Sequence, residues 1–266
     1  MTPFDYPHRI ETIRIVGLGG TGAQVARTVC RMVYDMKQRK LQYPRVVFTD
    51  PDTVDMSNVG RQLFTPADVG HNKAEVAMRR FNAALGLATE AEPQKFSPHL
   101  RYGLTTLIIG CVDSHTARRD IAKAQSDEDF LWIDAGNNHA SGQVVIGNRG
   151  QIDKLPLNHP WGARYHLEAL PTAALLFPQL LQPDTEDKTV SCAELMERGS
   201  QSLIVNDWMA AAVAGYVYKL LYRKPIESFV TYVSDEIRNV PIEQATIRQM
   251  LGLEEPKKQK RQKRHM

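Results

Sequence analysis

The chain has 266 residues, 42% of them hydrophobic and 24% charged, which is the composition of an ordinary globular protein with enough chain to bury a sizeable core. Its formal net charge of +3 is concentrated at one end, because six of the 33 basic residues lie in the last ten positions. The rest of the chain carries 27 basic against 30 acidic residues, which argues against a body that binds nucleic acid.

The cysteines and the apolar segments indicate the compartment. Cys30, Cys111 and Cys192 form no CxxC pair, so a four-cysteine zinc site and a disulfide framework are both excluded, and a reducing cytosol is favoured. The first residues hold an acid and two prolines in place of the apolar run of a signal peptide. The longest apolar stretch, 208–221, is too short to span a bilayer. We expect a cytoplasmic protein that makes no membrane contact.

The first half of the chain reads as alternating strands and helices. Residues 12–16 are rich in β-formers and end in a glycine run, which a helical pattern follows, and 45–49 reads as the next strand. Two strands joined by a helix, with a glycine turn after the first, predict a parallel βαβ unit. Further patterns predict helices at 71–88, from 114, at 201–222 and from 242, and strands at 105–109, 130–134, 142–146 and 228–233.

This regularity stops between residues 150 and 190, which hold five prolines and no sustained period. We therefore expect an α/β fold of the doubly wound, Rossmann-like class, with a mostly parallel sheet and an irregular crossover insertion at 150–200. Residues 1–256 are expected to form a single domain, and 257–266 a basic, solvated, disordered tail.

The pattern Gly17-x-Gly19-Gly20-x-Gly22 lies between the first strand and its helix, where a nucleotide loop belongs. Small residues let backbone N–H groups approach phosphate closely, and the helix N-terminus favours negative charge. A tight turn that packs helix against sheet is the plainer interpretation. Asp50 ends the second strand, where an acid reaches the ribose hydroxyls of NAD or ATP, although a solvated carboxylate would look the same.

A polar cluster distinguishes a triphosphate from a dinucleotide. Residues 57–62 hold Asn58 and Arg61, which one helical turn would place on a common face, and Lys73 follows shortly after. Hydride transfer needs no such cations, whereas the negative charge of a triphosphate must be neutralised before a nucleophile attacks phosphorus. Asp113 ends the apolar fourth strand, and its carboxylate can hold Mg²⁺, cap the next helix, or do both.

Several stretches of the chain occur together in the order and register of one known family. They are Gly17-x-Gly-Gly-x-Gly22, Asp50-x-Asp52-x-Val54-x-x-Ser57-Asn58-x-x-Arg61-Gln62, Gly70-x-x-Lys73, Asp113 and Gly142-Gln-Val. Together they resemble the ThiF/MoeB superfamily, the adenylating domains of ubiquitin-activating enzymes and of sulfur-carrier activators. The resemblance covers about residues 10–147 and resumes at 190–223.

The resemblance implies an activity and its residues. ATP and Mg²⁺ would lie over the glycine loop, and a small ubiquitin-like or sulfur-carrier protein would offer its C-terminal Gly-Gly carboxylate to the α-phosphorus. The nucleotide residues it assigns are Gly17, Gly19, Gly20, Gly22, Asp50, Asp52, Ser57, Asn58, Arg61 and Lys73, with Asp50 on the ribose and Asn58, Arg61 and Lys73 around the phosphates. Asp113 would bind the metal, and the family implies a homodimer.

The chain also departs from that family. The paired CxxC zinc motifs of many relatives are missing, so no zinc is expected, and Ser114 follows Asp113 where relatives usually have Asn. Only Arg9 and Arg14 precede the glycine loop, and Arg14 lies inside the first strand, so a cross-subunit arginine stays unassigned.

Relatives often pass the activated carrier to a cysteine. Cys192 lies at the end of the irregular segment and is either that nucleophile or a packing residue, whereas Cys30 and Cys111 are most simply packing residues. The Ser-Cys-Ala-Glu context, followed by Gln201-x-Leu-x-x-Asn206, resembles the ThiF-like members of plasmid-borne PRTRC operons, which suggests a conjugating-type partner. An NAD-dependent oxidoreductase and a non-catalytic ThiF-like scaffold are the alternatives.

Overall fold

The fold is an α/β structure built on one mixed sheet, and the doubly wound class expected from the sequence is confirmed. The computed structural model describes residues 2–127, 129–137, 141–158, 161, 167–183 and 192–253, without the side chains of 126, 127 and 192–203. The expected basic tail at 257–266 lies outside these residues.

Eight strands of the described chain form the sheet in the order β3-β2-β1-β4-β5-β6-β7-β8. The first five in this order run parallel, and β6, β7 and β8 pair antiparallel. The strands are β1 Thr12–Val16, β2 Arg45–Thr49, β3 Glu90–Glu92, β4 Thr106–Gly110, β5 Leu131–Asn137, β6 Gly142–Gly147, β7 Ser228–Val233 and β8 Ile237–Pro241. Every residue of β4 is buried, as expected for a central strand with both faces covered.

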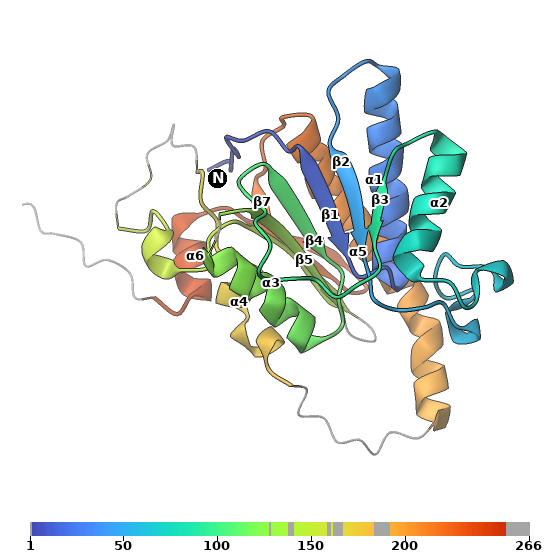
Figure 1. Ribbon diagram of the computed structural model, residues 1–266. Coiled ribbons are helices and arrows are strands. Elements are labelled where there is room, and N and C mark those ends of the chain that lie inside the picture. Colours follow the sequence, from blue (N-terminus) through green and yellow to red (C-terminus); the bar gives the residue numbers. More distant parts are fainter. Residues whose placement is uncertain are drawn as a thin grey trace, which may run out of the picture.

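Helices cover both faces of the sheet (Figure 1). Helices α1, α2 and α5 pack as one layer, and α3 and α4 lie on the other side. The helices are α1 Gly20–Gln38, α2 Lys73–Leu85, α3 His115–Asp127, α4 Ala173–Leu176, α5 Cys192–Leu221 and α6 Gln244–Met250, and the 3-10 helices are η1 Met56–Asn58, η2 Pro66–Asp68, η3 Ile152–Lys154 and η4 Pro178–Leu181. None of the helices in the described ranges combines the length and apolar character that a bilayer crossing requires.

Local sequence explains why α2 begins and ends where it does. The side chain of Asn72 accepts hydrogen bonds from the backbone N–H of Ala74 (2.9 Å) and Glu75 (3.2 Å), which caps the first turn. Gly86 ends the helix in the left-handed conformation, with φ of 59°. The helix expected over 71–88 is therefore confirmed with tighter ends.

Elsewhere the structure holds more regular elements than the sequence pattern indicated. Helix α5 begins at Cys192, nine residues before the expected 201, and the irregular segment contains η3, α4 and η4. The edge strands β3 and β8 were not expected, because Glu90–Glu92 and Ile237–Pro241 lack a buried apolar alternation.

Candidate functional site

A cavity of ≈ 630 Å³ opens at the edge of the sheet where β1, β2 and β4 end. Open α/β sheets bind their ligands at this carboxyl edge, and the volume suits a nucleotide-sized molecule. Eight of the eleven residues to which the resemblance assigns a nucleotide or metal role line it: Gly17, Gly19, Gly20, Asp50, Asp52, Arg61, Lys73 and Asp113.

The glycines of the loop divide into two kinds. Gly17 has a φ of +87°, and a Cβ there would lie 2.7 Å from the carbonyl oxygen of Cys111. A Cβ on Gly22 would lie 1.8 Å from the carbonyl oxygen of Gly17, so these two glycines allow α1 to pack against the loop. Gly19 and Gly20 instead face the cavity at the start of α1, where backbone N–H groups can approach a ligand.

Asp50 is held at the end of β2 by two backbone donors. Its Oδ2 accepts from the N–H of Leu18 at 2.5 Å, and its Oδ1 accepts from the N–H of Asp52 at 2.9 Å. Burial, with 4% of the residue exposed, raises the pKa of Asp50, although these N–H groups and the charge of Lys73 act in the opposite direction. The carboxylate is thus part of the cavity wall as well as a candidate ribose ligand.

Cationic side chains gather beside β2. Lys73, only 8% exposed, lies 3.3 Å from the Asp52 carboxylate through its Nζ atom. Arg61 is exposed on the cavity and forms no ion pair with any of the described residues. Lys95, which sequence analysis did not single out, lines the same cavity. Such positive charges are what a site for a phosphorylated ligand requires.

Ser57 and Asn58 do not line the cavity. Ser57 donates through its backbone N–H and its Oγ to the Asp55 carboxylate, at 2.7 and 2.5 Å, and the Asn58 Oδ1 accepts from the N–H of Asp55 at 3.1 Å. The 3-10 helix η1 ends at Asn58, and Gly60, with φ of +80°, then turns the chain. Arg61 therefore reaches the cavity from outside any helical turn, while the side chain of Asn58 is turned into the loop.

Asp113 and Ser114 have separate roles at the start of α3. The Ser114 Oγ accepts from the N–H of Thr116 (3.2 Å) and Ala117 (3.4 Å), so Ser114 caps the helix and the alternative of Asp113 as the cap is wrong. Asp113 is exposed to the cavity and forms no hydrogen bond or ion pair with the described residues.

The donor set fits Mg²⁺ only in combination with a phosphorylated ligand. In the described part of the chain no three side chains of His, Cys, Asp or Glu gather as a metal site would require. A single unpaired carboxylate such as Asp113 is nevertheless what Mg²⁺ uses when substrate phosphates and waters complete its shell.

The cavity also holds polar residues that sequence analysis did not assign to a nucleotide site. Asn137 ends β5 and Asn206 lies on α5, and the two side chains meet at 2.8 Å. In the sequence, Asn206 stands out only as part of the pattern that resembles the PRTRC subfamily. No sequence signal places it here, because the meeting depends on how α5 returns across the sheet.

Cys30 and Cys111, the two cysteines whose side chains the structure describes, are poor nucleophiles. Cys30 is fully buried in α1, and burial raises the pKa of its thiol to about 12. Cys111 lies at the cavity floor, where burial, and then the negative charge of Asp134, raise its thiol pKa to about 12. Both therefore stay thiols near neutral pH. Cys192 is the first residue of α5, and its side chain lies outside the described part.

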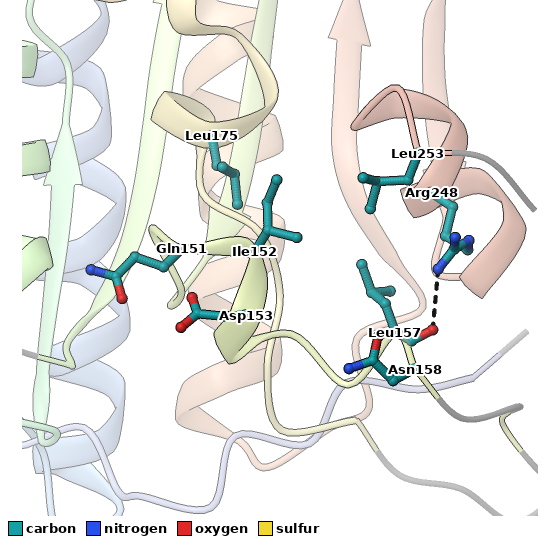
Figure 2. Close-up of a pocket in the computed structure, with 8 residues that line it drawn as sticks. All are labelled: Gln151, Ile152, Asp153, Leu157, Asn158, Leu175, Arg248 and Leu253. Atoms are coloured by element: carbon teal, nitrogen blue, oxygen red, sulfur yellow. Dashed lines mark hydrogen bonds between the residues drawn. The ribbon is translucent and has the colours of Figure 1, made fainter. Parts of the chain in front are cut away.

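A second hollow, of ≈ 670 Å³, shares no residue with this cavity (Figure 2). Part of its lining comes from the segment that follows β6. The lining is mainly apolar and includes Leu157, Leu175 and Leu253. In Figure 2 the Arg248 guanidinium points to the carbonyl oxygen of Leu157, to which its Nη1 donates at 3.2 Å. Its only charged lining residues are Asp153 and Arg248, so it lacks the gathering of several acidic and basic side chains that lines the first cavity.

Comparison with known proteins identifies relatives over about half of the chain. Ubiquitin-like modifier-activating enzyme 5 of Branchiostoma floridae is 26% identical over 158 residues, 53% of this chain and 37% of the relative. The enzyme of the same name from Caenorhabditis elegans is 26% identical over 157 residues, 51% and 34% respectively. The matches thus span little more than a third of these relatives' length.

Solved structures share the fold more widely. The crystal structure of E. coli MccB with ATP gives a TM-score of 0.58 at 16% identity, covering 91% of this chain and 67% of that one. A crystal structure of PaaA gives a TM-score of 0.53 at 22% identity, covering 88% and 64%. The sequence pattern of the ThiF family matches residues 9–259. The chain therefore belongs to the ThiF family, as its motifs indicated.

Proposed function

We propose that this protein activates the C-terminal carboxylate of a small partner protein by adenylation. A carboxylate oxygen of the partner attacks the α-phosphorus of ATP, the bond from that phosphorus to the bridging oxygen breaks, and pyrophosphate leaves. The observation that supports this most is the meeting of the glycine loop, Asp50, Arg61, Lys73 and Asp113 in one cavity.

Each residue of that cavity suits one part of ATP. The N-terminus of α1 favours the phosphates, and Asp50 at the end of β2 favours the ribose hydroxyls. Arg61 and Lys73 supply positive charge where negative charge accumulates as pyrophosphate leaves. Ser57 and Asn58 act in this proposal by holding the loop that presents Arg61.

Asp113 would hold Mg²⁺ together with the phosphates. Bound there, Mg²⁺ would supply positive charge that offsets the phosphate charge opposing attack by an anion. The attacking carboxylate is already ionised near neutral pH, so this chain has no proton to remove. Catalysis then consists of alignment and charge neutralisation by the residues around the cavity.

The names of the relatives support a proposal about the nature of the partner. Several bear the name ubiquitin-like modifier-activating enzyme, and one MccB structure contains N-formylated MccA. We infer a ubiquitin-like or sulfur-carrier protein ending in Gly-Gly, acted on in the cytoplasm by residues 1–256 as one domain. We include in this proposal a second step, in which the activated partner passes to Cys192 as a thioester. We also include a conjugating-type protein as a further partner, and membership of the PRTRC group.

We further infer a homodimer through helix α5. Ile204 (60% exposed), Trp208 (36%) and Tyr218 (39%) share one side of this helix with Ala211 and Gly215, at alternating spacings of four and three. The stripe is self-complementary, so the same stripe on a second copy of the chain can pack against it. Light scattering behind size-exclusion chromatography is expected to show a dimer that Trp208→Glu converts to monomer, with Ile237→Glu on β8 as the control.

ATP–pyrophosphate exchange tests the reaction, with small proteins ending in Gly-Gly added one at a time. Exchange that depends on one of them and is lost in Asp113→Ala, but kept in Asp153→Ala, supports adenylation, because Asp153 lines only the second hollow. ATP binding without exchange for any partner would favour a scaffold. Binding of NAD in preference to ATP with Mg²⁺ would favour the oxidoreductase.

A further inference from the structure

Asn206 joins three elements at one corner of the cavity. Its Oδ1 accepts a hydrogen bond from the Thr21 hydroxyl at 2.9 Å and another from the Asn137 amide at 2.8 Å. Thr21 belongs to the first turn of α1, Asn137 is the last residue of β5, and Asn206 lies on α5. The glycine loop is thereby tied to a helix that lies 185 positions later in the chain.

These two bonds set the orientation of the Asn206 amide. Because Oδ1 takes both donors, Nδ2 is the other branch of the planar amide, on the opposite side of Cγ. That atom lies beside the glycine loop, since a Cβ built on Gly20 would come within 2.4 Å of it. Asn206 lines the cavity, and its Nδ2 has no hydrogen-bond partner among the described residues.

We propose that Asn206 is a nucleotide-binding residue whose Nδ2 donates to an anionic phosphate oxygen of the bound nucleotide. The assignment rests on the proposed function, since it places the phosphates at the start of α1. There Gly19 and Gly20 offer only backbone N–H groups, and the Asn206 amide adds a side-chain donor held ready by Thr21 and Asn137. The phosphate site would then combine residues from two distant parts of the sequence, the glycine loop and helix α5.

A purely structural role for Asn206 makes a different prediction. If the residue only holds Thr21 and Asn137, Asn206→Asp should function normally, because a carboxylate still accepts both hydrogen bonds. If Nδ2 meets phosphate, the same substitution replaces a donor by a negative charge beside the nucleotide's own charge. Asn206→Asp keeps the contacts that hold the fold, so it remains informative even where Asn206→Ala is unstable.

The test is calorimetric titration of the purified full chain with ATP plus Mg²⁺, with AMP and with adenosine. We expect Asn206→Ala to weaken ATP binding about tenfold and Asn206→Asp about a hundredfold, with AMP affected in the same order. Adenosine, which has no phosphate, should bind all variants equally. Asn158→Asp makes the same chemical change at an exposed residue of the second hollow and should bind ATP as the unaltered chain does.

The outcomes separate this assignment from the proposed function. Wild-type affinity for ATP in Asn206→Asp, or equal losses for ATP and adenosine, overturns the assignment. A wild-type chain that binds no nucleotide overturns the proposed function and the assignment with it. ATP binding that shows the expected order of variants, without pyrophosphate exchange, supports the assignment and counts against adenylation alone.

Discussion

The backbone N–H of Leu18 donates a 2.5 Å hydrogen bond to Oδ2 of Asp50, 32 positions later in the chain. The other carboxylate oxygen accepts from the N–H of Asp52 at 2.9 Å. One buried side chain thus holds both the glycine loop and the loop after β2. The shape of the proposed nucleotide site therefore exists before a ligand binds, which lowers the entropic cost of binding.

Asp50→Asn is expected to lower both stability and nucleotide affinity. An amide has one acceptor oxygen, so one of the two backbone N–H groups loses its partner and faces the new NH₂ group instead. We expect a loss of about 1–3 kcal/mol in the free energy of unfolding, measured by urea denaturation, and weaker ATP binding by calorimetry. Asp153→Asn, at an exposed position, is the control. Unchanged stability in Asp50→Asn would contradict the holding role.

Substitution by alanine should mainly lower stability at Gly22 and mainly lower ATP affinity at Gly19. A Cβ on Gly22 would lie 1.8 Å from the Gly17 carbonyl oxygen, whereas a Cβ on Gly19 meets nothing within 4 Å. Gly22→Ala should cost at least about 3 kcal/mol of stability, because backbone must move. Gly19→Ala should stay within about 1 kcal/mol yet weaken ATP binding, since its methyl group enters the cavity. Thermal denaturation and calorimetry distinguish the pair, and equal melting temperatures would count against this packing.

The parts of the site that sequence analysis predicted lie where local pattern and topology act together. Strand, glycine turn and helix follow one another directly, and parallel strands bring their carboxyl ends to one edge, so Asp50 and Asp113 could be placed there in advance. Asn58 was expected beside Arg61 on a helical turn. That expectation failed because η1 ends at Asn58 and Gly60 turns the chain.

What could not be predicted depends on contacts between distant segments. Asn137 and Asn206 meet only because α5 packs back on α1 and β5 after the irregular segment. The edge strand β3 has only three residues, two of them glutamates, so no apolar alternation marks it. In each case the energy that decides the structure comes from pairing with a partner far along the chain, and no local pattern carries that information.

The buried thiol of Cys30 should make the protein lose stability in alkali. Burial raises its pKa from 9.0 to about 12, so above pH 9 the unfolded chain releases a proton that the folded chain retains. Stability from this group is complete below pH 9 and declines as pH rises towards 12, by about 1.4 kcal/mol per pH unit. Urea denaturation between pH 8 and 11 should show a shallower decline in Cys30→Ala. If stability declined with pH equally in the two proteins, the Cys30 thiol would have the same pKa in the folded and unfolded states.

Gly20 and Asn206 should behave as a coupled pair in nucleotide binding. A Cβ on Gly20 would lie 2.4 Å from the Nδ2 of Asn206, so Gly20→Ala must push that amide aside and weaken ATP binding. In an Asn206→Ala background nothing remains to displace, and the same change should leave ATP affinity unaltered while raising the melting temperature slightly, because Ala favours helix over Gly. Calorimetry on the four proteins of this double-mutant cycle measures the coupling. If Gly20→Ala weakened binding equally in both backgrounds, its effect would come from the glycine loop alone, and the close approach of the Asn206 amide would have no part in holding the nucleotide.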